Sequence, residues 1–425
     1  MAPSQASTTE PSVKQACLEA WRERRIDALA LGAALTAVPV SIAVSEIFLG
    51  AALLARIVAA IRVRQVPSAP WIIRVWLVWA GLELVSWFNS PRIAAGTGEI
   101  RHLFLIAALF FLIPALDRAS YKTAVWRCIF ITASAGSIVL AGGFVVRMIR
   151  YRQVIAAGGD SSFYLRSGGL LHHWMIFAVV EIMVFAALLE YHAAFPEHRR
   201  WVMPSLAING LAILLSLTRA LWIGCFLLWA IHLAWRRSKW IWVVPIVPAL
   251  AFLLAPAAIR HRVVQSLQPD YYSNTERIQM WRVGAKMIAE HPVFGVGAGR
   301  VDELYTSYLA PGEPVPAYHG HLHDDALQLA AQFGLPVLAA AMLYVAVLVW
   351  QLFRALQSAS ECEDRFLCRT ALLGLTGFLL AGLTDYSYGH ALGLILVSFV
   401  TLAPLDGSLL HQTERVHLAD RGATG

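Results

Sequence analysis

The chain has 425 residues, of which 58% are hydrophobic and 14% are charged, so it departs from soluble domains, in which about 25% of residues are charged. The formal net charge of +7 does not indicate a nucleic-acid partner, because the basic residues lie in short segments between apolar runs, where they set membrane orientation. The five cysteines show no C-x-x-C spacing, so neither a zinc site nor a disulfide framework is predicted from them.

Apolar runs of about 20 residues, the length needed to cross a hydrocarbon core of about 30 Å, recur along the chain. They cover residues 27–44, 46–62, 71–89, 101–117, 123–147, 169–191, 201–217, 219–235, 240–258, 326–353, 366–384 and 388–405. Such runs are too long for barrel strands, and helices satisfy their own backbone groups in lipid. We therefore expect an all-α polytopic membrane protein with about twelve transmembrane helices.

The polar segments set the predicted organisation. Residues 1–25 form a polar lead, 26–258 hold nine helices, 259–325 form one long helical loop, 326–405 hold three helices and 406–425 form a tail. Arg and Lys are concentrated in alternate short loops, and the positive-inside rule puts those loops and both termini in the cytoplasm. The long loop, and a smaller one at 148–168, then lie outside.

The stretch between the seventh and eighth runs predicts a hairpin. One helix over 201–235 would be about 52 Å long at 1.5 Å per residue, more than one crossing needs. We expect the chain to turn at Arg219, directly after Ser216-Leu217-Thr218. A guanidinium surrounded by lipid there would cost at least about 2.5–3.5 kcal/mol. Arg219 therefore either extends to lipid phosphates or binds an anion through paired hydrogen bonds.

The long loop contains helix signals. Ser273 and Glu276 have the S-x-x-E spacing of a capping box, and His291 precedes a proline, so a helix is expected between these points. Arg277 would lie in its first turn, where a positive charge opposes the helix dipole. It is either a solvated surface arginine or an anion ligand. Turn glycines at 295, 297 and 299 and a short helix over 302–309 are expected next.

A polar cluster closes the long loop. It contains His319, His321, His323, Asp324 and Asp325. Imidazole and carboxylate groups are zinc ligands, but alternate residues bind one ion only where the backbone is extended. The two aspartates also suit a helix N-cap. A histidine that titrates near neutrality can instead accept a proton from a hydroxyl, and a solvated structural cluster is the third alternative.

Other polar residues are weaker candidates. Arg166 ends the smaller loop, just before His172 and His173, as a third candidate anion ligand, with a lipid-headgroup contact as the alternative. Glu83 and Glu181 fall inside apolar runs, so each should face a helix partner or a wet cavity. A polar turn that we expect only to rim the site contains Asp385, Tyr386, Tyr388 and His390.

Three stretches resemble the bacterial O-antigen ligase and O-antigen polymerase superfamily. They are Ser216-Leu217-Thr218-Arg219-Ala220-Leu221-Trp222, similar to T-x-S-R-x-x-W; Arg277 and Trp281 with Glu290-His291-Pro292-Val293-Phe294-Gly295; and His323-Asp324-Asp325-Ala326-Leu327 before Gly334-Leu335-Pro336, similar to H-N-x-x-L before G-L-P. The resemblance covers about residues 204–338. Leu217 replaces a frequent serine and Asp324 the usual asparagine, so a contact behind the site is expected to differ.

This resemblance implies a metal-independent, inverting, GT-C-like membrane glycosyltransferase without a cofactor. Its donor would be a glycan on undecaprenyl diphosphate, used at the periplasmic face of a Gram-negative inner membrane. A ligase moves the glycan onto the outer core of lipid A-core, whereas a polymerase moves it onto another carrier-linked repeat. The single long outer loop favours the ligase.

The resemblance also implies roles for individual residues. Arg219 and Arg277, with Arg166, would contact the diphosphate, and His323 would act as general base. A second tier contains His319, His321, Asp324 and Trp281. The alternative from another class is a lipid-linked-sugar transporter without chemistry, which predicts charges along a path through several helices. Arg56, Glu83 and Glu181 keep that alternative open.

Overall fold

The computed structural model describes residues 12–64, 70–158, 165–171, 173–255, 257–268 and 270–405, and these residues form helices and no strand. Most of the predicted lead, the tail at 406–425 and His172 lie outside the described residues. The helices are α1 Val13–Arg22, α2 Ile26–Ala37, α3 Ile42–Val63, α4 Ile73–Phe88, α5 Arg101–Leu112, α6 Ala119–Ala156, α8 Trp174–Ala194, α9 Arg199–Leu215, α10 Arg219–Trp235, α11 Ile246–Leu254, α12 Ala257–Ser266, α13 Tyr272–Glu290, α14 Val301–Leu304, α15 Asp325–Phe333, α16 Leu335–Ser358, α17 Cys362–Gly382 and α18 Ala391–Leu402. The all-α prediction is confirmed for this part of the chain.

Five described helices are long and apolar enough to cross a membrane, which makes this a helical membrane protein. They are α3, α6 over Ala119–Tyr151, α8, α16 and α17. Shorter apolar helices accompany them, among them α2, α10 and α18. The count of twelve spans stays a prediction.

Helix α8 is the centre of the bundle. It packs against α6, α9, α10, α17 and α18, and most of its residues are apolar and buried, as expected for a helix enclosed by others. Small residues let its neighbours approach closely. A Cβ on Gly224 of α10 would lie 2.4 Å from Ile182 Cδ1, and a Cβ on Gly377 of α17 would lie 3.1 Å from Ile182 Cγ1.

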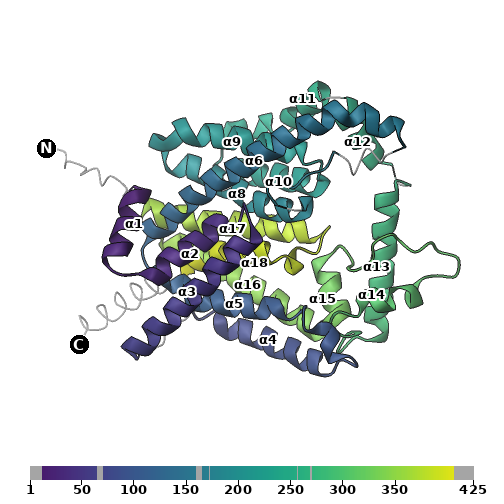
Figure 1. Cartoon of the computed structure of the whole chain (residues 1–425), viewed down its shortest axis with the longest axis horizontal. Helices are drawn as coiled ribbons and strands as arrows, with labels where there is room; N and C mark the ends of the chain where they lie inside the picture. The colour runs from purple at the N-terminus through teal and green to yellow at the C-terminus, as the bar shows by residue number, and fades with distance from the viewer. Residues whose placement is uncertain are drawn as a thin grey trace.

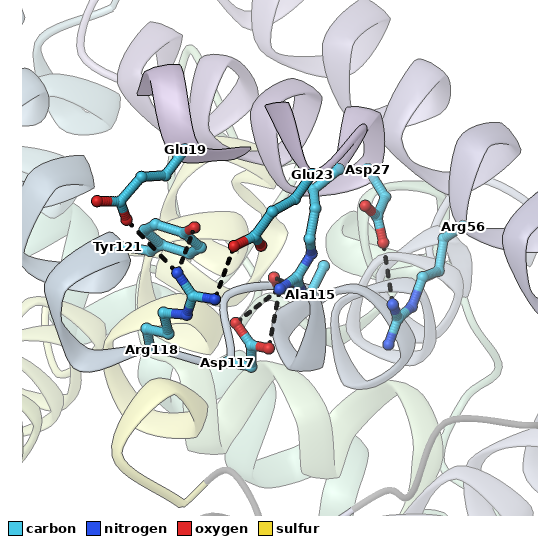
Figure 2. Close-up of polar contacts among 9 residues, drawn as sticks. Glu19, Glu23, Asp27, Arg56, Ala115, Asp117, Arg118 and Tyr121 are labelled. Atoms are coloured by element: carbon cyan, nitrogen blue, oxygen red, sulfur yellow. Dashed lines mark hydrogen bonds and ion pairs between the residues drawn. The ribbon is translucent and has the colours of Figure 1, made fainter. Parts of the chain in front are cut away.

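Polar contacts fasten α1 to the start of α6 (Figure 2). Arg118 donates hydrogen bonds to Glu19 at 3.4 Å and to Glu23 at 2.8 Å, and Arg25 forms an ion pair with Asp117 at 2.8 Å. These contacts gather at the end of the bundle where α1 lies, opposite α13 (Figure 1). The two ends of the molecule therefore differ. At one end, ion pairs join α1 and the residues after it to the start of α6, and at the other end α13 runs across the bundle (Figure 1).

The predicted boundaries of two spans are wrong. The first hairpin turns at residues 38–41 rather than at 45, because Pro39 interrupts the helix and Ser41 Oγ caps α3 by accepting from the Val44 amide at 3.4 Å. The predicted span at 240–258 is a 3-10 turn, Lys239–Val243, followed by α11 and α12. Pro245 directly before α11 explains that break.

The predicted tenth span is also divided, and the division positions the site. Gly334, with φ of 91°, separates α15 from α16, and a Cβ there would lie 2.1 Å from the Val293 carbonyl oxygen. The Leu335 amide donates to the Pro292 carbonyl at 2.8 Å. Because Gly334 has no Cβ, Val293, just after α13, can pack against the break between α15 and α16. We call residues 257–324, which include α12, α13 and α14, the interhelical segment. The contact of Pro292 and Val293 with the break between α15 and α16 fixes this segment to the bundle.

The smaller loop begins later than predicted. Helix α6 extends through Ala156, well past the predicted end at 147, and would be about 57 Å long at 1.5 Å per residue. Such a helix exceeds a hydrocarbon core of about 30 Å, so its end lies beyond the apolar layer. Of the connection between α6 and α8, the structure describes residues 157–158, 165–171 and 173.

Candidate active site

The hairpin between α9 and α10 sets the position of Arg219. The predicted turn is confirmed: α9 ends at Leu215, two residues before the predicted end, and α10 begins at Arg219. Leu217 has φ of 55°, in the left-handed region that few residues other than glycine adopt. Ser216 Oγ accepts a hydrogen bond from the Thr218 amide at 3.2 Å, which closes the turn. The tight turn leaves Arg219 at the very start of α10.

Arg219 joins α10 to the interhelical segment. Its Nη1 donates to the Ser266 carbonyl at 3.0 Å and to Asn274 Oδ1 at 2.8 Å, and its Nη2 donates to Ser273 Oγ at 3.3 Å. The guanidinium carbon lies 5.7 Å from the centroid of the Tyr271 ring. Protein groups rather than lipid phosphates therefore hold this side chain. These bonds do not use all the N–H donors of a guanidinium.

Helix α13 carries Arg277 and begins earlier than predicted. Its N-cap is Tyr271, without a side-chain cap bond, so the predicted capping box is wrong. Ser273 lies inside the helix, and its hydroxyl accepts from Arg219 instead of from a backbone amide. Arg277 then falls in the second turn, so the predicted conflict with the helix dipole is also wrong. The predicted end is confirmed, since α13 stops at Glu290.

An apolar cluster fixes α13 against the end of the interhelical segment. The cluster contains Met280, Val283, Met287, Val296, Val301, Tyr305, Leu322 and Ala331. Leu322, directly before His323, is completely buried in it. Packing between α13 and this part of the chain therefore sets the distance between Arg277 and the histidines.

His323 is held in an unusual backbone conformation. Its φ is 50°, a left-handed value for which histidine is more tolerant than most residues, and such values cluster at functional sites. On one side, the Leu322 amide donates to Gln328 Oε1 at 2.8 Å. On the other, Asp324 Oδ1 accepts from the Leu327 amide at 2.8 Å, which confirms the predicted N-cap of α15. These bonds fix the backbone on both sides of the imidazole.

Asp385, in the connection between α17 and α18, faces His323. Asp385 Oδ1 lies 3.4 Å from His323 Nδ1, and Oδ2 lies 3.5 Å from His390 Nε2. Burial opposes ionisation of Asp385, but its contacts with the two imidazoles outweigh burial and lower the pKa of the carboxyl below its usual range. From the sequence, Asp385 was expected only to rim the site. The structure puts it beside the candidate base.

His321 lies next to His323, whereas three other candidates lie elsewhere. The His321 and His323 ring centroids are 4.1 Å apart, and burial, followed by the neighbouring His323, lowers the pKa of His321 to about 3, so its imidazole is neutral at pH 7. His319 Nε2 instead lies 3.4 Å from Asp302 Oδ1. Trp281 is 39% exposed, and like His319 and Asp324 it does not line the cavity described next.

A cavity of about 480 Å³ lies between α13, the histidines and the start of α8. It is lined by Arg166, His173, Trp174, Met175, Tyr272, Ser273, Glu276, Arg277, Met280, Tyr318, His321, His323 and His390. An adjoining pocket of about 40 Å³ shares Arg166 and Arg277 with it and adds Arg219 and Asp385. Three arginines from three segments and four histidines, His323 among them, thus line the two adjoining cavities.

This arrangement differs from that of a second cavity of similar size. That cavity, of about 470 Å³, lies between α1, α2 and α6, and its lining is almost wholly apolar. The first cavity combines guanidinium groups, which bind phosphate oxygens, with an imidazole beside an ionised carboxylate, which can accept a proton. It is therefore suited to hold a polyanion next to a hydroxyl that loses its proton.

Residues 204–342 match the family model described as O-antigen ligase. The matched segment includes Arg219, Arg277 and His323, whereas Arg166 and Asp385 lie outside it. No curated protein matches the chain. The match covers about a third of the chain, and together with the helical membrane fold it supports a relation to the O-antigen ligase/polymerase superfamily.

Proposed function

We propose that this protein is an O-antigen ligase that transfers a glycan from undecaprenyl diphosphate to the outer core of lipid A-core. The observation that carries the proposal is the shared lining of the two adjoining cavities, in which Arg166, Arg219 and Arg277 lie around the space that His323 also borders. The family match supports a glycan-transferring activity on lipid-linked sugars. The three arginines and His323 support displacement of a lipid diphosphate by a deprotonated hydroxyl.

The arginines would bind the diphosphate of the donor. Arg277 lines both cavities, and Arg219, which lines the smaller one, has donors left beyond its three hydrogen bonds. Arg166 lines both, with its guanidinium carbon 5.3 Å from the Trp174 ring centroid. As the glycosidic bond breaks, the lipid diphosphate gains negative charge. Fixed guanidinium groups stabilise that charge more than they stabilise the ground state, and such electrostatics often supply the largest catalytic contribution.

His323 would act as the general base. Because Nδ1 faces Asp385, the competent tautomer carries its proton on Nδ1 and leaves Nε2 free to accept the proton of the acceptor hydroxyl. The hydroxyl oxygen then attacks the anomeric carbon while the bond to the diphosphate breaks. One displacement inverts that carbon. Asp385 would orient the ring and stabilise the imidazolium that forms, and no step in this sequence requires a metal ion.

The transporter alternative is less well supported. Arg56 forms an ion pair with Asp27 at 2.9 Å, and Glu83 lies 2.6 Å from His102 Nε2, so two of the three charges that favoured it face partners within the bundle. Arg277 lies on α13, which crosses the end of the molecule opposite α1 (Figure 1), and the other groups of the proposed mechanism line the same cavities as Arg277. This polarity supports a periplasmic active site in the inner membrane with both termini cytoplasmic.

The test is reconstitution of the purified protein with carrier-linked glycan and lipid A-core. We expect a covalent glycan–lipid A-core product, with inverted configuration at the transferred anomeric centre. Longer carrier-linked chains without that product would identify a polymerase instead. Movement of the donor between bilayer leaflets without any covalent product would identify a transporter and overturn the proposal.

A further inference from the structure

A cluster of metal-ligating groups lies at the edge of the proposed active site. In the described chain, His321, His323 and Asp385 each offer one ligand atom, and these atoms all lie within 4.8 Å of one another. This is not the set that the sequence suggested. His319 faces Asp302, and Asp324 caps α15, so the aspartate that joins the two histidines comes from the connection between α17 and α18.

The distances suit a small divalent cation. Zinc is bound by nitrogen and oxygen at about 2.0–2.1 Å in a tetrahedron, so two of its ligand atoms lie about 3.3–3.4 Å apart. His323 Nδ1 and Asp385 Oδ1 are 3.4 Å apart. The third ligand atom, on His321, lies within 4.8 Å of the other two, and the adjoining cavity leaves room for water in the fourth position.

The contact between the facing atoms of His323 and Asp385 is long, at 3.4 Å. Asp385 is only 6% exposed, yet its Oδ1 and the Nδ1 of His323 have no hydrogen-bond partner of good geometry among the described residues. Buried polar atoms without partners are uncommon in folded proteins and require an explanation. A shared cation between the carboxylate and the imidazoles would satisfy both atoms at once.

We propose that His321, His323 and Asp385 form a Zn²⁺ site and that its occupation blocks glycan transfer, an inference that rests on the proposed function. Zinc at Nδ1 of His323 takes the lone pair that faces Asp385, and the proton of the neutral ring then resides on Nε2. That nitrogen becomes a donor and cannot accept the proton of the acceptor hydroxyl. The ion is a reversible inhibitor, and the metal-free protein is the active form.

The test uses the full-length protein in lipid nanodiscs, freed of metal with a chelator and then titrated with Co²⁺. We expect the visible ligand-field absorption of four-coordinate cobalt, which Zn²⁺ then displaces. Loss of a partner outside the ligand set already costs about 10- to 100-fold in metal affinity, so His321→Ala is expected to weaken cobalt binding by at least about 100-fold. The matched control is His261→Ala, which removes an exposed histidine of α12 and should leave the spectrum unchanged.

Activity supplies the second readout. Zinc is expected to inhibit transfer by the wild-type protein, with recovery on chelation, and His321→Ala should raise the half-inhibitory zinc concentration relative to its own zinc-free rate. Absence of the cobalt spectrum, or its persistence in His321→Ala, would overturn the site. Stimulation by zinc would overturn the inhibitory role. A cobalt spectrum in a protein without any transferase activity would refute the proposed function and leave the site intact.

Discussion

Replacement of His323 by asparagine is expected to lower the rate of glycan transfer by about 100- to 10,000-fold, the contribution that a general base makes. Asparagine tolerates the left-handed backbone at this position, where φ is 50°, so the variant should fold. The measurement is the single-turnover rate of product formation in the reconstituted system, with both substrates saturating. Donor binding should change little, because the imidazole acts on the acceptor.

Two further variants show whether the lower transfer rate of His323→Asn reflects loss of the general base. Asp385→Asn keeps the shape of the side chain but removes the charge 3.4 Å from His323 Nδ1, so it should also slow transfer, with less effect on donor binding than on rate. His261→Ala, on the exposed surface of α12, should retain the wild-type rate. A His323→Asn protein that folds and transfers glycan at the wild-type rate would exclude His323 as the base.

Replacement of Arg277 by alanine is expected to lower the transfer rate by about 100- to 1,000-fold, since removal of one preorganised group that stabilises developing charge has effects of this size. Arg277→Lys keeps the charge but loses the planar pair of donors that fits phosphate oxygens, so it should recover only part of the activity. The measurement is the rate of release of undecaprenyl diphosphate, together with the affinity for the donor.

The control for Arg277 lies on the same helix. Arg282 is about half exposed and pairs with Glu313, away from both cavities, so Arg282→Ala should leave the rate unchanged. Thermal unfolding of each variant checks that α13 is still in place. An Arg277→Lys protein with wild-type turnover would argue against paired hydrogen bonds to the diphosphate.

Local signals in the sequence predicted the parts of the site that depend on nearby residues. The turn before Arg219 follows from the length limit of one crossing, the end of α13 from Pro292, and the N-cap by Asp324 from its position before an apolar run. In each case the residues that determine the backbone lie within a few positions of one another. Local signals are sufficient to predict the backbone where no contact with a distant residue competes with them.

Distant contacts account for what the sequence analysis missed. Ser273 does not cap α13, because its hydroxyl bonds to Arg219, which is 54 residues away in the chain. Asp385 reaches His323 only because α17 packs beside α8, α10 and α16, and no spacing in the sequence indicates that contact. The signal that was available was its position in a polar turn at the end of an apolar run.

The structure of the protein bound to its undecaprenyl diphosphate donor tests the central claim most directly. We predict diphosphate oxygens at about 3 Å from the guanidinium nitrogens of Arg277 and Arg219, a normal hydrogen-bond distance, with the anomeric carbon on the side of the cavity that His323 borders. A diphosphate bound away from these arginines, for example at the apolar cavity between α1, α2 and α6, would contradict the account.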